Sequence, residues 1–480
     1  MPNPYLPTWE YIPDGEPRVF GDRLYVYGSH DRFGGDYFCM NDYVCWSAPL
    51  DDLESWRYEG VIWRRAWDPM PVTEATEYMF APDAVQGSDG RYYLYYGTDM
   101  YSRIAVAVSD TPAGEYRFHG EVHYPDGVRY GGRNGEVIRF DPAVLHDTDG
   151  STWLYTGFSS HSKWLAEFSA KRGYSINGEG AQVVRLDDDM LTVLTEPKTV
   201  VPGLDGEKDT DFEGHSFFEA SSIRHFDDKY YFIYSSCLSH ELAYAVSDRP
   251  DGGFAYAGAL HSNCNIGCNG QTSPEYYYGN NHGSIAEIGG RYYIFGHRQT
   301  GKGGYARQGV AEPLTMDENG LFSQAEMTSG GLSGVLKADR TYEAAIACVL
   351  YDGDEATGVC DGNSEERAAR AQITQDGEDR ECAPGQYIKN IHEGTTVGYK
   401  YFDLAESTVV TLSIRGSASG IISVKSEKCG APVAKIALSP SESIMTYSEC
   451  LPKQSEKTAI YLTFEGSGSF DLYEIGFIPA

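Results

Sequence analysis

The chain has 480 residues and a net charge of −32, which comes from 38 basic and 70 acidic residues. This charge repels polyphosphates, so nucleic acid and anionic membranes are excluded as partners, whereas a neutral small molecule is compatible with it. No apolar run approaches the roughly 18 residues that span a bilayer. With 37 Tyr and 54 Gly, the composition favours strands and turns over helices. The length predicts two domains.

The N-terminus, MPNPYLPTWEY, has neither the basic segment nor the apolar segment of a signal peptide. The ten cysteines lack paired CxxC spacing, and the single CNIGC motif is weak evidence for a metal site. We therefore expect reduced thiols in a cytoplasmic protein. A chain trimmed of its signal peptide would instead be secreted.

One phrase occurs five times, each time as a Gly or Asp turn followed by an alternating aromatic strand. Such a phrase is typical of a β-hairpin. The aromatic anchors of the five copies are Tyr25, Tyr93, Trp153, Tyr231 and Tyr293. The copies are GDRLYVYGSHD from Gly21, SDGRYYLYYGTD from Ser88, TDGSTWLYTGFS from Thr148, FDDKYYFIYSS from Phe226 and IGGRYYIFGHRQ from Ile288.

A second phrase alternates with the first and consists of a strand, a polar turn and a short aromatic strand, as in VAVSDTPAGEYRF from Val106. Each unit therefore holds about four strands, and such units stack radially as propeller blades. The sequence predicts an all-β chain in three parts. These are a five-bladed β-propeller over residues 1–325, a connector over 326–345, and a β-sandwich of the jelly-roll type over 346–480.

Three acidic positions differ from the acids in the DG and DD turns, because each lies beside an apolar or aromatic strand. They are Asp14 or Glu16 in IPDGEPRVF, Asp141 in FDPAVLHDTDG, and Glu219 in SFFEASS. Innermost strands of a propeller converge on its axis, so these positions can meet in one pocket. Side chains alternate along a strand, so Asp14 and Glu16 are expected to share a face. Phe218 and its neighbours should partly desolvate Glu219 and raise its pKa, as a general acid requires.

These motifs, in this order, resemble glycoside hydrolase family 43. The resemblance includes an acid before GDRLYVYGSHD, then DPAVLHDTDG, a Glu before DDKYYFIYSS, and finally NNHGSIAEIGGRYYIFGHRQ and YARQGVAEPL, and it covers residues 4–325. It implies a five-bladed propeller enzyme that hydrolyses arabinosyl and xylosyl linkages with inversion and needs no cofactor for that chemistry. The C-terminal region, notably YIKNIHEGTTVGYKYFDL, is similar to family 6 carbohydrate-binding modules.

Carried over to this chain, the resemblance makes Asp14 the general base, Asp141 the modulator of pKa and orientation, and Glu219 the general acid. The family commonly has Asp-Pro at the base, whereas here Gly15 follows Asp14, and Glu16 precedes the proline. Counting back from the first repeat favours Asp14, with Glu16 as a neighbour that positions it or contacts substrate. An inverting pair needs carboxyl groups about 6.5–9.5 Å apart, and we expect Asp141 to repel the charge of Glu219 and keep it protonated.

The resemblance also implies further contacts in the pocket. His282 matches a position near the axis that serves a structural calcium ion, directly or through water, with a buried core histidine as the alternative. Arg307 matches an arginine that contacts sugar, with an ion pair to a blade acid as the alternative, and Arg298 is a weaker candidate of the same kind. Asp83, in FAPDAV, resembles the family's APD segment and is interpreted as a pocket-wall or structural acid, and Phe218 is a candidate to stack on a sugar face.

The predicted function is that of an exo-acting inverting α-L-arabinofuranosidase on plant-derived oligosaccharides, with a β-xylosidase or an exo-galactanase as the alternative. Its partner would be a small oligosaccharide, and the sequence leaves the oligomeric state open. Two rivals from other classes are a retaining fructan-type enzyme, with carboxyl groups about 5–5.5 Å apart, and a non-catalytic sugar-binding propeller. The IPDGEP start disfavours the first, and the presence of all three acids disfavours the second.

Overall fold

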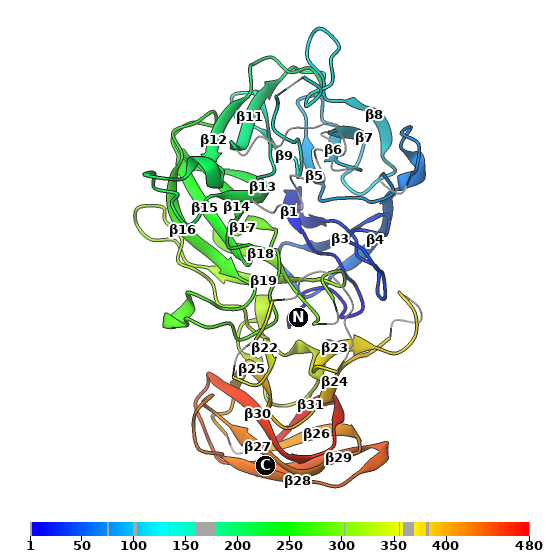
Figure 1. Cartoon of the computed structure of the whole chain (residues 1–480), viewed down its shortest axis with the longest axis vertical. Coiled ribbons are helices and arrows are strands. Elements are labelled where there is room, and N and C mark those ends of the chain that lie inside the picture. The colour runs from blue at the N-terminus through cyan, green and yellow to red at the C-terminus, as the bar shows by residue number, and fades with distance from the viewer. Residues whose placement is uncertain are drawn as a thin grey trace.

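The computed structural model describes residues 2–73, 76–98, 103–133, 135–159, 179–301, 303–354, 356–358, 369–380, 384–406 and 408–479. They form a β-propeller and a β-sandwich, and the N-terminus lies near the junction of the two (Figure 1). Among these residues no helix is long and apolar enough to cross a membrane. The predicted all-β fold is confirmed. The helices within the described ranges are the 3₁₀ turns η1 (Arg65–Trp67), η2 (Leu204–Gly206), η3 (Cys268–Gly270), η4 (Gly331–Ser333) and η5 (Ala344–Ile346).

Five sheets form the propeller, and within each sheet strands that follow one another in the sequence are neighbours. The first four blades have four strands, and the fifth has three in the part of the chain that the structure describes. The strands of blades one and two are β1 (Glu16–Phe20), β2 (Arg23–Tyr27), β3 (Tyr43–Pro49), β4 (Arg57–Trp63), β5 (Asp83–Gln86), β6 (Tyr92–Tyr96), β7 (Ala105–Ser109) and β8 (Arg117–Glu121). Those of blades three to five are β9 (Ala143–His146), β10 (Thr152–Thr156), β11 (Gly180–Leu186), β12 (Lys198–Pro202), β13 (Phe217–Phe226), β14 (Lys229–Ser236), β15 (Glu241–Ser247), β16 (Ala255–Ser262), β17 (Ser284–Ile288), β18 (Arg291–Arg298) and β19 (Gln308–Leu314).

The repeated sequence phrase is the first hairpin turn of each blade together with its second strand, β2, β6, β10, β14 or β18. In the second copy, Gly90 adopts a φ of +80°, and the Arg91 N–H donates to Asp89 Oδ1 at 3.0 Å, which closes the turn. Tyr93, the anchor of this copy, is buried in a core that also contains Leu154 of blade three. The aromatic repeat therefore packs one blade against the next.

The innermost strands β1, β5, β9, β13 and β17 contact one another in a closed ring around the propeller axis (Figure 1). Two buried ion pairs cross this ring, Arg18 Nη2–Asp83 Oδ2 at 2.5 Å and Arg224 Nη2–Glu16 Oε2 at 2.7 Å. Arg18 also donates to a main-chain carbonyl of β9 at 3.0 Å, and Arg224 donates to one of β17 at 2.8 Å. These four side chains, called the axial ion pairs below, therefore connect all five blades.

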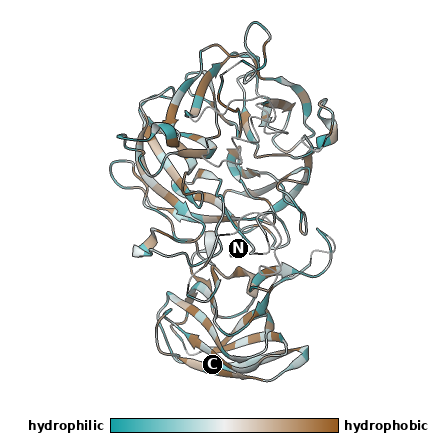
Figure 2. Cartoon of the chain, in the orientation of Figure 1, coloured by the Kyte–Doolittle hydropathy of each residue, from teal (hydrophilic) through white to brown (hydrophobic). Residues whose placement is uncertain are grey.

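The C-terminal domain is a sandwich of two sheets, with strand orders β20-β25-β30-β27-β28 (β22 beside β25) and β23-β24-β31-β26-β29 (β21 beside β31). Apolar and polar residues alternate along its strands (Figure 2), and in β28 every second side chain is buried. The strands are β20 (Leu336–Lys337), β21 (Thr341–Glu343), β22 (Val349–Asp352), β23 (Gln372–Gln375), β24 (Gln386–Ile391), β25 (Thr395–Asp403), β26 (Thr408–Gly416), β27 (Ser419–Lys425), β28 (Ala434–Leu438), β29 (Ser441–Leu451), β30 (Thr458–Ser467) and β31 (Phe470–Pro479).

Part of the region expected to be a connector, 326–345, pairs with the sandwich. β20 pairs in parallel with β25, and β21 pairs with β31. Strands of two or three residues are too short to show alternation in a sequence, so the pattern does not reveal them.

The two domains share a buried interface. Tyr276 and Tyr277 of the propeller lie in the hydrophobic core of the sandwich. Lys400 Nζ of the sandwich contacts Glu275 Oε2 at 2.8 Å and Glu326 Oε1 at 2.9 Å, and all three groups are largely removed from solvent. The sandwich is therefore packed against the propeller rather than joined to it by a linker alone.

Candidate active site

A cavity of about 540 Å³ lies at the propeller axis. Its acidic side chains and one histidine come from the beginnings of innermost strands, with Asp14 before β1, Asp141 before β9, His282 before β17 and Glu219 near the start of β13. A mainly aromatic wall around a few converging polar groups is typical of a small-molecule site. The aromatic rings are those of Tyr37, Phe38, Phe80, Phe140, Phe158, Phe218 and Tyr305.

The backbone at the three acids departs from regular strand geometry. Asp14 and Asp141 have φ values of 56° and 45°, and Ala220, next to Glu219, has a φ of 68°. The β13–β14 register also shifts on both sides of Glu219, and such a bulge turns a side chain out of the alternating pattern. Left-handed conformations are costly for these residue types and concentrate at functional sites. All three acids are thus held in irregular backbone that directs them to the cavity.

Asp14 is a buried carboxylate in a strongly cationic environment. Arg307 Nη1 lies 3.1 Å from its Oδ1, and Ser29 Oγ donates to its Oδ2. The Asp14 N–H donates to His297 Nδ1 at 3.3 Å, while His297 Nε2 donates to Asn280 O at 2.6 Å. Burial alone would raise the pKa of Asp14, but the Arg307 guanidinium, His297 and His282 together outweigh burial and hold that pKa well below its usual range. Asp14 is therefore ionised at neutral pH, as a general base must be.

Glu219 has the opposite electrostatic balance. Burial of its carboxyl raises the pKa to about 7, and the charge of Asp14 adds to this shift. The hydrogen bond from Asn280 Nδ2 to Glu219 Oε1, at 3.3 Å, acts in the other direction. Glu219 therefore remains largely protonated in mildly acidic solution and can donate a proton, as a general acid must.

Asp141 interacts electrostatically with both of the other acids. Its Oδ2 accepts a hydrogen bond from the Ala220 N–H at 3.0 Å and lies 3.8 Å from His282 Nδ1. Burial raises the pKa of Asp141 well above its usual range, and the charges of Glu219 and Asp14 add to this. The repulsion we expected Asp141 to exert on Glu219 is thus expressed mainly on Asp141, which is the more deeply buried of the two.

Arg307 lines the cavity and is also fixed by ion pairs. Its Nε and Nη2 each lie 2.9 Å from a carboxylate oxygen of Asp31, and its Cζ lies 4.9 Å from the centre of the Phe38 ring. This bidentate pair is the ion pair with a blade acid that was expected as the alternative to sugar contact. The third Arg307 nitrogen, Nη1, donates to Asp14 Oδ1, so Arg307 orients that carboxylate and also lines the cavity.

His282 lies in the cavity with its Nδ1 3.9 Å from Asp14 Oδ1, and burial lowers its pKa to about 4. A calcium ion takes six to eight oxygen ligands. Within the described ranges no group of three or more His, Cys, Asp or Glu side chains has the arrangement of a metal site. The residues around His282 therefore do not fit a protein-made calcium cage, and we derive no catalytic step from a metal.

Three residues expected to contact substrate lie outside the cavity lining. Glu16 and Asp83 are the acids of the axial ion pairs, and Asp83 Oδ2 also accepts the Val144 N–H at 2.8 Å. Arg298 donates to Ala345 O at 2.6 Å and to Ala347 O at 2.8 Å, so it joins β18 to the sandwich. All three are buried with their partners and meet structural needs instead of contacting a ligand. Of the expected aromatic contacts, Phe218 does line the cavity.

Sequence reasoning missed several lining residues. Asn280 precedes the NHGS motif, and Gln299 is the last residue of GHRQ. Tyr37 and Tyr305 come from glycine-rich loops outside the repeat. Asp31, the partner of Arg307, closes the first repeat phrase, GDRLYVYGSHD, and so lies after its strand rather than in its opening turn. That position was the one sequence signal that could have set this acid apart from the turn formers.

Comparison with known proteins agrees with this geometry. The family described as glycosyl hydrolases family 43 matches residues 12–322. A xylosidase/arabinosidase from Thermoclostridium stercorarium is 46% identical over 98% of this chain and 97% of the relative. The match to this relative thus spans the sandwich as well as the propeller.

Two solved structures have the same fold. CoXyl43, a family 43 β-xylosidase/α-arabinofuranosidase from a compost microbial metagenome, was solved with xylotriose in a calcium-free form. It is 27% identical, with a TM-score of 0.51, and the match covers 68% of this chain and 96% of that one. The second is a family 43 arabinoxylan arabinofuranohydrolase from Bacillus subtilis, solved with cellotetraose. It is 17% identical, with a TM-score of 0.52, and the match covers 100% of this chain and 97% of that one. The family match ends at residue 322, so the likeness of the sandwich to family 6 carbohydrate-binding modules stays a prediction. By its sequence over residues 12–322 and by its five-bladed fold, this chain belongs to glycosyl hydrolase family 43, an inverting family.

Proposed function

We propose that this enzyme is an exo-acting pentosidase that removes α-L-arabinofuranosyl or β-D-xylosyl units from plant-derived oligosaccharides. One observation carries the catalytic part of the proposal. In one cavity, Asp14 has a pKa well below its usual range, and Glu219 has a pKa of about 7. Two carboxyl groups whose pKa values are pushed apart are what acid–base hydrolysis of a glycosidic bond requires.

In the proposed mechanism, Glu219 protonates the oxygen of the leaving group as the glycosidic bond breaks. Asp14 accepts a proton from a water molecule, which attacks the anomeric carbon from the opposite face and inverts its configuration. Arg307 and Ser29 hold the two oxygens of Asp14, so the base keeps one orientation. Asp141, bound to the Ala220 N–H, fixes the backbone that carries Glu219.

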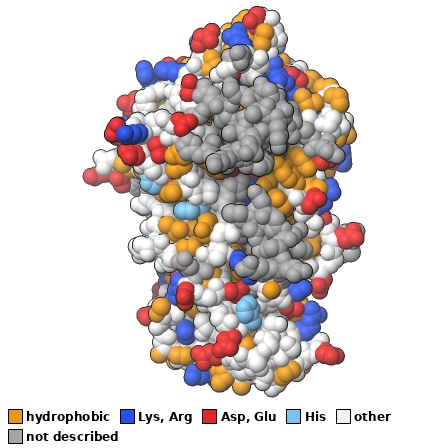
Figure 3. Space-filling view, viewed as in Figure 1, with side chains coloured by type: hydrophobic (Ala, Val, Ile, Leu, Met, Phe, Trp, Pro, Cys, Tyr) orange, Lys and Arg blue, Asp and Glu red, His pale blue; other side chains and the backbone are white. Residues whose placement is uncertain are grey.

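The substrate class rests on the lining of the cavity and on the names of the relatives. Aromatic rings can stack on the apolar faces of sugar rings, and a neutral sugar is indifferent to the overall charge. Acidic and basic side chains are interspersed around both domains on the face shown in Figure 3, so the negative charge is spread over that face. The named activities of the similar proteins, xylosidase and arabinosidase, make pentosyl units the first choice.

A panel of 4-nitrophenyl glycosides tests the proposal. The α-L-arabinofuranoside, the β-D-xyloside and the β-D-galactoside are compared, and NMR follows the anomer first released. We expect turnover of at least one of the two pentosides with inversion. Release of a retained anomer, or preference for the galactoside, would contradict the proposal.

A further inference from the structure

The loop between β2 and β3, residues 28–42, carries one wall of the cavity. Tyr37, Phe38 and Cys39 of this loop line the cavity. The Tyr37 ring lies 4.3 Å from Tyr78 and 6.0 Å from Tyr305 between centroids, and the Phe38 ring lies 4.7 Å from Tyr305. The position of this loop therefore sets the position of the aromatic side chains that form this wall of the cavity, called the aromatic wall below.

The two legs of this loop are held by a single carboxylate from the other domain. Asp379 lies in the turn between β23 and β24 of the sandwich. Its Oδ1 accepts the Phe33 N–H at 2.8 Å, and its Oδ2 accepts from Asn41 Nδ2 at 2.9 Å. Phe33 and Asn41 stand on either side of the lining residues, so one side chain closes the loop as a clasp. Hydrogen bonds to a charged acceptor are stronger than those between neutral groups.

The next residue of the same turn holds the base of the loop. Arg380 Nη1 donates to Glu10 Oε1 and lies 3.1 Å from His30 Nε2. His30 precedes Asp31, the acid that binds Arg307. The turn of the sandwich thus contacts the loop next to the residue that orders the catalytic centre.

Asp379 is, we propose, a positioning residue through which the sandwich domain sets the aromatic wall of the pentosyl pocket. It acts through Phe33 and Asn41 and does not line the cavity itself. The inference rests on the proposed function, because the wall is taken to contact the sugar. A wall that contacts substrate and transition state alike contributes uniform binding, so its loss raises KM and leaves kcat unchanged.

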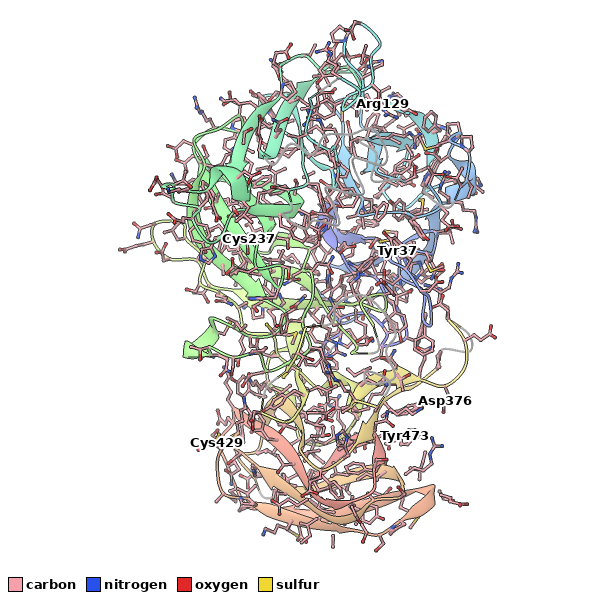
Figure 4. The ribbon with its side chains drawn as sticks, viewed as in Figure 1. Tyr37, Arg129, Cys237, Asp376, Cys429 and Tyr473 are labelled. Atoms are coloured by element: carbon pink, nitrogen blue, oxygen red, sulfur yellow. The ribbon has the colours of Figure 1, made fainter. Side chains whose placement is uncertain are left out.

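Asp376, three residues before Asp379, offers a matched control position for a variant. Asp376 lies in the same turn, and its Oδ1 accepts the Tyr387 hydroxyl at 3.0 Å, a contact within the sandwich. In Figure 4 Asp376 lies at the side of the sandwich nearest the propeller, and Tyr37 lies in the propeller above it. Asp376→Ala removes an acid from this turn without touching the loop, whereas Asp379→Ala removes the clasp.

Steady-state kinetics on the better pentoside of the panel test the inference. Loss of two charge-assisted hydrogen bonds should raise KM about 10-fold in Asp379→Ala, with kcat within about 2-fold of wild type. Asp379→Asn keeps one acceptor oxygen and should raise KM less. Asp376→Ala should leave KM within about 2-fold. An unchanged KM in Asp379→Ala, or an equal rise in Asp376→Ala, would overturn the inference.

Hydrogen exchange supplies a readout that does not depend on turnover. Backbone amides of residues 32–41 should exchange faster in Asp379→Ala than in wild type or Asp376→Ala, because the clasp no longer restrains both legs. Equal exchange in all three proteins would refute the clasp. Absence of wild-type activity on every pentoside would instead contradict the proposed function and leave the exchange result to decide on the clasp.

Discussion

Replacing Glu219 by Gln tests the central assignment of the site. Gln has nearly the same shape and can keep the contact with Asn280, but it has no proton to give to a leaving group. The expected result depends on the leaving group. A poor one, such as the sugar of a natural oligosaccharide, needs the proton, whereas a dinitrophenolate departs without it.

The size of the effect follows from the pKa of Glu219. At pH 6 a carboxyl with the usual pKa of 4.5 is about 3% protonated, whereas one with a pKa of about 7 is about 90% protonated. The cavity therefore enlarges the share of the acid form by about 30-fold at that pH. General acid catalysis contributes about 10²–10⁴-fold, and we expect Glu219→Gln to lose that much on xylo- or arabino-oligosaccharides.

The assay measures kcat/KM from pH 4 to 9 on an oligosaccharide and on a dinitrophenyl pentoside. Wild-type activity on the oligosaccharide should fall as pH rises through about 7, because Glu219 must be protonated to act. With the dinitrophenyl substrate, Glu219→Gln should lose about 10-fold or less, and the fall near pH 7 should be absent. Glu213→Gln, a change at an exposed glutamate near the start of β13, is the control. If Glu219→Gln kept more than a tenth of the oligosaccharide activity, or kept the fall near pH 7, the assignment would be refuted.

Three further predictions concern the stability effect of Glu219, the choice between Asp14 and Glu16 as the base, and the role of Arg298. The folded-state pKa of Glu219 lies above its unfolded value, so native stability falls as pH rises from about 4.5 to about 7. Glu219→Gln should therefore raise the Tm by about 1–3 °C at pH 8 but not at pH 4. Equal melting curves of the two proteins at pH 8 would contradict this. Asp14→Asn should lose activity about 10²–10⁴-fold and regain part of it with azide. Glu16→Gln should lower the free energy of unfolding by about 3–5 kcal/mol, because Arg224 loses its anionic partner. The activity of Glu16→Gln should not respond to azide. The reverse pattern of rescue would identify Glu16 as the base. Arg298→Met should lower the Tm and leave KM within about 2-fold, and a selective rise in KM would return Arg298 to the pocket.

The fold was predictable from the sequence because the propeller repeats itself. Five copies of a turn and an aromatic strand can be counted without knowing how they pack, and each copy became the first hairpin turn and second strand of a blade. The same regularity placed Asp14, Asp141 and Glu219 at equivalent points before or at the start of innermost strands. The short strands β20 and β21 were not predictable, because pairing with distant strands, and not a local pattern, forms them.

The partners of the buried charges could not be predicted. The alternation rule put Asp14 and Glu16 on one face. Asp14, however, precedes β1 and has a φ of 56°, and this left-handed backbone breaks the alternation. Asp14 therefore meets Arg307, and Glu16 meets Arg224, which is more than 200 residues away in the chain. A sequence shows which residues carry charge, but the pairing of those charges follows from the closure of the ring.

The axial ion pairs have a consequence for how sugar preference can change. Closure of the ring depends on Arg18, Asp83, Glu16 and Arg224, while the aromatic wall of the cavity comes mostly from loops and strand ends. Substitutions in the wall can therefore reshape the cavity without loosening the blades. A mutant library restricted to wall positions should yield mostly folded proteins with altered preferences, and a library at the axial positions should yield mostly unfolded ones.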